Sequence, residues 1–287
     1  MSFSQQRPII GGQPVENHDY PFAVYLSIET QPSWHAVCGG TLLSPKHIVT
    51  AGHCLYHAPS AQSIKVGYGH THTNKQITTK PLKYTIHPLF NPRTLFNDIA
   101  IIELAEPIKS TEVAHRIPVY FGPVEPGLTV TTMGWGITSN NPGAKTVPIM
   151  HRVDLTVAPT NKCMNVDGTF TSSNGPFICT GTMPGGRDEC NGDSGSPAVV
   201  TFDNGRALRK GVRMRAGLRA GMGGDVRLVA LTSYGDNINH DVRPACGDPN
   251  GFGFSTHIGH YEAFLTNVTG MTRQQLEQPV ILDRQVK

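Results

Sequence analysis

The sequence predicts an all-β protein, either a sandwich or a barrel, and three observations support this prediction. The chain contains 31 glycines and 22 prolines, which punctuate its whole length. Short runs rich in Val, Ile, Thr and Tyr lie between these turn residues, which is typical of many short strands. Helical periodicity is absent until a segment near the end of the chain. With 287 residues, the chain can bury a substantial core as one large β domain or two small ones.

Nine runs are predicted as strands because each is short, rich in β-branched or aromatic residues, and bounded by turn residues. They are Phe22–Ile28, Val37–Leu43, Lys83–Ile86, Ile99–Leu104, Thr129–Gly134, His151–Val157, Pro197–Phe202, Leu228–Tyr234 and Phe252–His257. A helix is predicted over Ile258–Val268, where apolar side chains recur on one face. Met271–Lys287 follows as a polar tail.

One segment interrupts the strand pattern. Asn204–Asp225 is rich in Gly and Arg and shows no strand alternation, although a predicted strand lies on each side of it. Such a segment is expected to form an exposed insertion loop. Its charge is compatible with a basic patch for anionic partners. A solvated loop without a partner is the favoured interpretation.

Composition narrows the class of protein. Hydrophobic residues make up 38% of the chain and charged residues 16%, which is typical of a globular protein rather than a disordered one. The net charge of +3 is too small to argue for binding of nucleic acid. No apolar run approaches the length of a membrane span. We therefore expect neither nucleic acid nor a membrane as a partner.

The six cysteines are even in number and widely spaced, which predicts three disulfides. No C-x-x-C pair occurs, which argues against zinc ribbons and thioredoxin-type sites. Disulfides indicate an oxidising compartment, so we expect an extracellular protein. The first eight residues contain no apolar run that could serve as a signal peptide. The expectation of secretion therefore depends on the cysteines.

Three short stretches supply a histidine, an aspartate and a serine, namely His53, Asp98 and Ser194. A serine hydroxyl is a poor nucleophile at neutral pH and needs a base within hydrogen-bond reach. That base needs a partner that fixes its tautomer and stabilises the imidazolium. The chain order His, Asp, Ser differs from the orders used by subtilisin and the α/β-hydrolases.

With these stretches, the chain resembles the trypsin-like serine proteases of the chymotrypsin fold. Seven motifs carry the resemblance, in order: Ile9–Gly12, Cys38–Gly40, Thr50–Cys54, Asn97–Ala100, Gly134–Gly136, Gly192–Gly195 and Ser233–Gly235. The resemblance covers roughly Ile9 to Val268. It implies two six-stranded antiparallel β-barrels with a C-terminal α-helix and an active site between the barrels. The protease domain would span residues 9–270, after a propeptide remnant over residues 1–8.

The resemblance implies a role for each residue of the site. His53 would be the general base and acid, Asp98 the residue that orients it, and Ser194 the nucleophile that forms the acyl-enzyme. The backbone N–H groups of Gly192 and Ser194 would form the oxyanion hole, where charge develops. The implied disulfides are Cys38–Cys54, Cys163–Cys179 and Cys190–Cys246.

The resemblance also implies activation by cleavage, after which the new α-ammonium of Ile9 pairs with Asp193 and shapes the oxyanion hole. The bond to be cut is Pro8–Ile9, and Arg7 is followed by a proline that resists tryptic cleavage. Another protease, or trimming after an earlier cut, would be needed. If Ile9 is never freed, the alternative is a non-catalytic protease homologue that acts as a binding protein.

Asp188 lies six residues before Ser194, where the family places the carboxylate that pairs with a substrate Arg or Lys. Ser233 and Gly235 would bind the substrate backbone as an added strand. Gly253 would leave room for a long side chain, with Gly251 as an alternative. These assignments predict a serine endopeptidase that cuts after Arg or Lys. They argue against an esterase with the same three residues.

Glu189 departs from the small residue that is usual beside the pocket floor. Its carboxylate either adds a second negative charge to the pocket or points to solvent, and both interpretations stay open. The sequon Asn267–Thr269 is a second open feature, because it falls at the end of the predicted helix.

No metal and no cofactor are expected. His53 and His57 lie four residues apart, but the role of His53 as a base excludes zinc. No acidic residue lies between Glu29 and Asp98, where a calcium loop would need ligands. The expected partners are protein or peptide substrates and protein inhibitors of proteases, and the chain is expected to act as a monomer.

Overall fold

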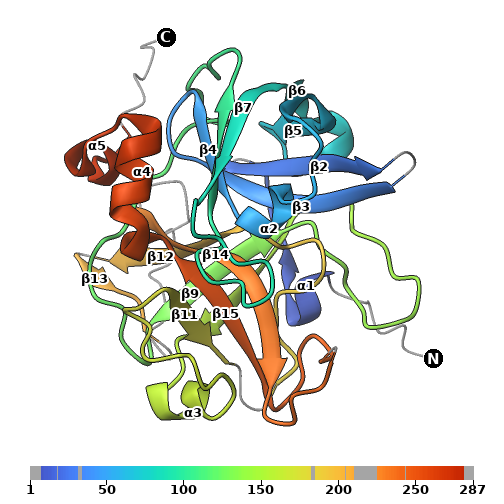
Figure 1. The fold of residues 1–287 in the computed structure, drawn as a ribbon, viewed down its shortest axis with the longest axis vertical. Coiled ribbons are helices and arrows are strands. Elements are labelled where there is room, and N and C mark those ends of the chain that lie inside the picture. Colours follow the sequence, from blue (N-terminus) through green and yellow to red (C-terminus); the bar gives the residue numbers. More distant parts are fainter. Residues whose placement is uncertain are drawn as a thin grey trace.

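The computed structural model describes residues 8–17, 19–31, 34–181, 185–203, 205–209, 225–242 and 244–280. Its strands form two antiparallel sheets, which occupy the upper and lower halves of Figure 1. Most of the insertion predicted over Asn204–Asp225 lies outside the described residues. No described helix is long and apolar enough to cross a membrane.

The first sheet is built from the N-terminal part of the chain. Its strands are β2 (Ala23–Gln31), β3 (Trp34–Leu42), β4 (His47–Thr50), β5 (Ile64–Tyr68), β6 (Ile77–Thr79), β7 (Pro81–Ile86) and β8 (Ala100–Leu104). Side chains alternate along β2: Val24, Leu26 and Ile28 are fully buried, whereas the residues between them are partly exposed. This period of two places one face of the strand in the core.

The pairing of these strands closes the first sheet into a barrel. The order is β6-β5-β2-β3-β4-β8-β7, so β6 and β7 lie at the two ends. Only Lys80 separates β6 from β7 in the chain. The two therefore behave as one interrupted strand, which pairs with β5 on one side and with β8 on the other. Counted in this way, the first barrel has six strands.

The second sheet is built mainly from the C-terminal part of the chain. Its strands are β1 (Gln13–Pro14), β9 (Thr129–Gly134), β10 (His151–Thr156), β11 (Phe177–Thr180), β12 (Pro197–Asp203), β13 (Arg206–Ala207), β14 (Asp225–Asn237) and β15 (Gly251–His257). The order is β1-β10-β9-β12-β14-β15-β11, and β13 pairs with β12. A bridge between Val157 and Thr180 joins β10 to β11 and closes the ring. Without the two-residue strands β1 and β13, this barrel also has six strands.

These sheets confirm the predicted fold class. Each of the nine predicted strands overlaps a strand of the structure. The sequence reading missed the short strands β1, β4, β5, β6, β11 and β13. β4 has only four residues, and its burial comes from the strands on either side of it rather than from a long apolar pattern.

The predicted C-terminal helix is present as the 3₁₀ turn Ile258–Tyr261 followed by α4 (Glu262–Thr269). Gly270 ends it in the left-handed conformation, with φ 70°. The segment read as a polar tail begins with a further helix, α5 (Arg273–Glu277). Thr272 and Gln275 form a capping box at its start, and Leu276 packs into the core of the first barrel. The C-terminal helices therefore close one end of that barrel.

The remaining helices are single turns, named α1 (Pro8–Gly11), α2 (Gly52–Leu55) and α3 (Thr160–Met164). Trp135, which follows β9, connects the barrels. Its ring nitrogen donates to the carbonyl of Thr71 at 2.7 Å, and its ring packs edge-on against Tyr25. Because Trp135 is buried, this contact fixes the two barrels relative to each other, and the site lies between them.

Candidate active site

His53 lies on α2, directly after β4, at the edge of the first barrel. The disulfide Cys38–Cys54 ties this turn to β3. The side chain of His53 is 27% exposed, so one side of the ring faces solvent. The short turn therefore presents an imidazole at the surface while its backbone is held by the barrel.

Asp98, just before β8, is fully buried and holds His53 at two points. Its Oδ1 accepts from the backbone N–H of His53 at 2.7 Å, and its Oδ2 lies 2.7 Å from His53 Nδ1. An ionised carboxylate only accepts hydrogen bonds, so Nδ1 carries the proton. In the neutral ring, Nε2 is then the acceptor that faces away from Asp98.

Ser233 on β14 donates its hydroxyl to Asp98 Oδ2 at 2.6 Å. The hydroxyl of Thr256 on β15 donates to the backbone carbonyl of Asp98 at 2.9 Å. Both donors come from the second barrel, whereas Asp98 comes from the first. The sequence motif marked Ser233 for substrate binding only. No local pattern could reveal either contact, because the residues are more than 130 positions apart in the chain.

Ser194 lies in the loop between β11 and β12, at the entrance of a cavity described below. Its carbonyl accepts from the backbone N–H of Gly39 at 2.8 Å, which fixes the loop against β3. In the described part of the chain, Ser194 Oγ makes no hydrogen bond to His53. Such contacts are often long in a free enzyme and shorten when substrate binds.

The backbone N–H groups of Gly192 and Ser194 donate to no acceptor among the described residues. Gly192 has φ 94°, a conformation that favours glycine. Two backbone hydrogen bonds hold the loop in this shape. The N–H of Gly195 donates to the backbone carbonyl of Thr232 at 2.8 Å, and the N–H of Ser196 donates to the backbone carbonyl of Asp193 at 2.9 Å. Within the described chain, the N–H groups of Gly192 and Ser194 are therefore both left without an acceptor.

Asp193 is buried below this loop. Its Oδ1 accepts from the backbone N–H of Gly136 at 2.8 Å, and its Oδ2 accepts from that of Cys190 at 3.0 Å. Burial raises the pKa of its carboxyl to about 7, against the effect of these two donors. No Lys, Arg or His among the described residues forms an ion pair with it.

Ile9 is buried within α1, where it packs with Val153 and Leu155 of β10. Its φ is 44°, a left-handed conformation that a β-branched residue strongly disfavours. The next carbonyl, that of Ile10, accepts from the backbone N–H of Asp188 at 3.1 Å. The N-terminal segment is thus bound to the loop that carries Ser194.

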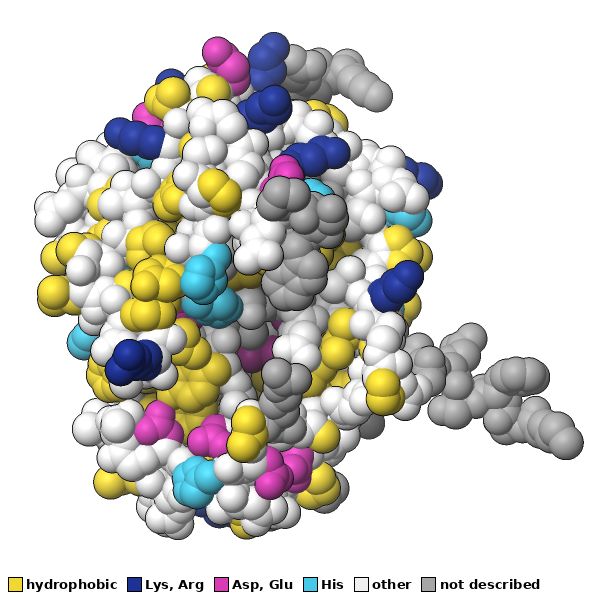
Figure 2. Space-filling model, turned by 45° about the vertical axis from the view of Figure 1, so that its right-hand side comes forward, with side chains coloured by type: hydrophobic (Ala, Val, Ile, Leu, Met, Phe, Trp, Pro, Cys, Tyr) yellow, Lys and Arg dark blue, Asp and Glu magenta, His cyan; other side chains and the backbone are white. Residues whose placement is uncertain are grey.

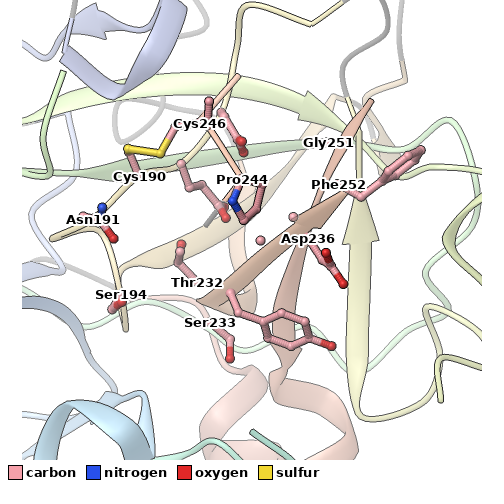
Figure 3. Close-up of a pocket in the computed structure, with 16 residues that line it drawn as sticks. Cys190, Asn191, Ser194, Thr232, Ser233, Asp236, Pro244, Cys246, Gly251 and Phe252 are labelled. Carbon is pink, nitrogen blue, oxygen red and sulfur yellow. A yellow bond between two sulfur atoms is a disulfide. The ribbon is translucent and has the colours of Figure 1, made fainter. Parts of the chain in front are cut away.

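A cavity of about 500 Å³ extends inward from Ser194 (Figure 3). Asp188 and Glu189 line it, together with the Ser233–Gly235 segment of β14 and the Gly251–Gly253 segment of β15. The disulfide Cys190–Cys246 lies on its wall. Figure 2 shows acidic side chains in a hollow on one face of the molecule, close to histidine side chains.

Asp188 and Glu189 both have raised pKa values. Burial raises the pKa of Asp188 to about 6, although the N–H of Gly247 donates to its Oδ2 at 3.0 Å. Burial, assisted by the charges of Asp188 and Asp193, raises the pKa of Glu189 to about 8. Glu189 is only 8% exposed, so the alternative in which its carboxylate points to solvent is wrong.

Gly253 lies opposite Gly235 in the β14–β15 pair, whereas Gly251 lies opposite Asn237. A Cβ on Gly253 would lie 3.4 Å from Glu189 Oε2 and 3.8 Å from Asp188 Oδ1. A Cβ on Gly251 would instead meet the backbone of Asp248. Of the two alternatives, Gly253 is therefore the glycine beside the carboxyl groups.

The third disulfide, Cys163–Cys179, joins α3 to β11. All three bridges are the pairs that the family resemblance implies. Among the described residues, one group of three could hold a metal by distance alone, namely Cys38, His53 and Cys54. Two of its members form a disulfide and have no thiolate to offer, so this group does not bind a metal as it stands.

Two antiparallel barrels, with a histidine held by a buried carboxylate that both barrels contact, are the architecture of the double-barrel serine hydrolases. Residues 9–212 match the family model described as Trypsin. A trypsin of Phaedon cochleariae is 32% identical over 197 residues, 67% of this chain and 74% of the relative. A trypsin of Saccharopolyspora erythraea is 31% identical over 196 residues (67% and 82%), and brachyurin of Leptuca pugilator is 30% identical over 190 (66% and 80%). The chain belongs to the trypsin family of serine proteases.

Proposed function

We propose that this protein is a serine endopeptidase that hydrolyses peptide bonds after Arg or Lys. The observation that carries the proposal is the acidic cavity that opens at Ser194, beside the His53–Asp98 pair. Ser194 Oγ attacks the peptide carbonyl while His53 Nε2 takes its proton. The resulting oxyanion accepts hydrogen bonds from the N–H groups of Gly192 and Ser194.

The imidazolium of His53 then gives its proton to the leaving amine, which leaves an acyl group on Ser194. A water molecule attacks this ester, with His53 again as the base, and releases the acid. Asp98 holds the ring in the required tautomer through both half-reactions and stabilises its positive charge. Because Asp98 also accepts from Ser233, its carboxylate is fixed from both barrels.

The substrate side chain before the scissile bond enters the cavity, where its cation meets the carboxylate of Asp188. The substrate backbone pairs with the Ser233–Gly235 segment in the manner of an added strand. Gly235 and Gly253 leave the cavity open along its length, since neither carries a side chain. No Lys or Arg of the described chain lines this cavity.

Activation follows when the Pro8–Ile9 bond is cut. The strained backbone of Ile9 is then free to relax, and its new ammonium becomes a partner for the buried carboxylate of Asp193. The alternative is a non-catalytic binding protein. One observation favours it: Asp193 has no cation partner among the described residues while Ile9 remains joined to Pro8.

The proposal includes the setting of this activity. Residues 9–270 form the protease domain, after a propeptide remnant over residues 1–8. The basic 204–225 segment, most of which lies outside the described residues, is an insertion in the sequence of this domain, and residues 271–287 form a C-terminal extension. The disulfides suit an oxidising compartment, and we place the protein outside the cell. There it acts as a monomer on proteins and peptides, and protein inhibitors compete for the same cleft.

Two preparations test the proposal: a chain that begins at Ile9, and the full chain with Pro8–Ile9 intact. Each is assayed on the p-nitroanilides of Arg, Lys and Phe. We expect the chain beginning at Ile9 to hydrolyse the Arg and Lys substrates and to leave the Phe substrate intact. Ser194→Ala in the same chain is the matched control, with no turnover and an unchanged circular dichroism spectrum. A folded chain beginning at Ile9 that hydrolyses none of these substrates contradicts the proposal and favours the binding-protein alternative.

A further inference from the structure

Glu189 is a buried carboxyl group that the proposed mechanism does not use. It is 8% exposed, and its Oε1 makes no hydrogen bond within the described chain. The hydroxyls of Thr132 and Thr232 lie close enough to this carboxyl to favour its charged form, although no hydrogen bond of good geometry joins them to Glu189. Neutral hydroxyls do not balance a buried negative charge, so Glu189 either stays protonated or obtains a cation from outside the described residues.

The geometry shows where such a partner would lie. The space beside Gly253 has Glu189 Oε2 on one side and Asp188 Oδ1 on another, 3.4 and 3.8 Å from the position of a Cβ. Thr180 Oγ1 lies 3.1 Å from the same position. Both carboxyl groups line the cavity that opens at Ser194. The two acids therefore approach the same part of the cavity, at a distance that a single guanidinium can span.

No Lys, Arg or His of the described chain lines this cavity, and Arg187 lies on the other side of Asp188, near Thr180 and Asp248. Asp193 lies in the loop that carries the two carboxyl groups. Strands β9 and β14 contribute the neutral hydroxyls of Thr132 and Thr232 to their surroundings, and β15 contributes Gly253. The loop after Cys246 adds the N–H of Gly247 and the negative charge of Asp248, both of which act on Asp188. Since no described cation lines the cavity, a cation that binds between the two carboxyls inside it enters with a ligand.

We propose that Asp188 and Glu189 form a two-carboxyl floor that shares one proton in the empty cavity and releases it to solvent when a guanidinium or ammonium side chain enters. This inference rests on the proposed function, because the cation is the substrate Arg or Lys. The step breaks only the O–H bond of one carboxylic acid and forms no bond to the ligand. Glu189 thereby becomes a residue that determines specificity.

The raised pKa values agree with this geometry. With a pKa of about 6 for Asp188 and about 8 for Glu189, the empty site holds about one proton at pH 7. Both groups ionise when a cation binds between them. The dissociation constant for the cation should then fall about tenfold for each pH unit between 6 and 8, and become constant above that range.

Benzamidine tests the inference, since it carries the arginine-like amidinium and stays charged throughout this range. Its binding to the chain that begins at Ile9 is measured by calorimetry at pH 6 to 9, in buffers of different ionisation enthalpy. We expect release of about one proton at pH 7. Glu189→Gln should abolish the release, flatten the profile above pH 7 and weaken binding at pH 8.5 about tenfold or more. Asp236→Asn, the matched control, removes a carboxylate from the rim of the same cavity and should keep the release.

The outcomes separate the two proposals. Benzamidine binding without proton release overturns the shared proton and leaves specificity for Arg and Lys intact. Proton release that persists in Glu189→Gln also overturns the inference, because the proton then belongs to another group such as Asp193. No benzamidine binding at pH 8.5 refutes the specificity itself. If Glu189→Gln does not fold, Glu189→Ser lacks the same carboxyl and must show the same loss of release.

Discussion

Asp193 should make the uncut chain lose stability as the pH rises. Its carboxyl has a pKa of about 7 in the folded chain and 3.8 as the ordinary value, a difference of about three units. A carboxyl whose folded pKa is raised binds its proton more tightly in the folded state. The contribution of Asp193 to the free energy of unfolding is therefore fully present below about pH 4 and is lost as the pH rises through about 7. Three units correspond to about 4 kcal/mol.

Most of this loss falls in a range that can be measured. The linkage relation gives a cost of about 1.5 kcal/mol at pH 5 and about 4 kcal/mol at pH 8, so the change between them is about 3 kcal/mol. Urea unfolding of the full chain, with disulfides intact, should show this decrease. Asp193→Asn removes it, because an amide does not ionise. Asp188 and Glu189 are present in both proteins, so the difference between the two slopes comes from Asp193, directly and through the effect of its charge on Glu189.

Cleavage at Pro8–Ile9 provides the second half of this test. The ammonium of Ile9 lowers the pKa of a carboxyl beside it, so the chain that begins at Ile9 should lose the steep dependence on pH. Glu112→Gln, which removes an exposed carboxylate, is the control and should leave all slopes unchanged. Equal slopes for the full chain and for Asp193→Asn would refute the reasoning, since they would show that Asp193 is not destabilised in the uncut chain.

Three further variants test the cavity and the aspartate. Asp188→Ser should raise KM for Arg and Lys amides at least tenfold, and an unchanged preference would remove Asp188 from the pocket. Gly253→Ala places a methyl group between the carboxyls and Thr180, so Arg amides should bind more weakly in inhibition assays, while unchanged binding would show that the cavity is wider there. Ser233→Ala removes a donor from the buried Asp98 and should lower the free energy of unfolding by about 1.5–3 kcal/mol, and an unchanged value in urea unfolding would show that the hydroxyl is not needed.

The fold was predictable from local patterns because its longer strands are runs rich in β-branched residues that end at turn residues. β9 and β12 are examples, with bounds close to those expected. The short strands were not predictable, since four residues such as His47–Thr50 carry too little pattern to separate a strand from a loop. α5 was missed for another reason: its polar residues resembled a tail, although the Thr272 and Gln275 capping box marks a helix start.

The motifs also placed the chemical groups, but not the contacts that control them. The chain shows that Glu189 follows Asp188, yet its direction depends on β9, β14 and β15, which close around it from distant parts of the sequence. The bond from Ser233 to Asp98 joins two barrels in the same way. Such contacts depend on long-range packing, and a single sequence contains no local signal for them.

The buried carboxylates Asp98, Asp193 and Glu189 differ in how many hydrogen-bond and charge partners the chain gives them. Under the proposed function, this difference indicates the stage at which each carboxylate obtains its last partner. Asp98 receives His53 and Ser233 within the folded chain, so it is ready before any other event. Asp193 receives two backbone donors but no cation, so it is completed only by the ammonium of Ile9. Glu189 has the neutral hydroxyls of Thr132 and Thr232 beside it but no cation among the described residues that line the cavity, so it is completed by the substrate. Asp98, Asp193 and Glu189 thus have progressively fewer partners within the chain. They obtain their full set of partners in the same order: on folding, on activation and on substrate binding. In the full chain, Asp193 still lacks its partner, so the loop that carries Glu189 is less firmly held. Benzamidine should therefore bind the full chain more weakly than the chain that begins at Ile9.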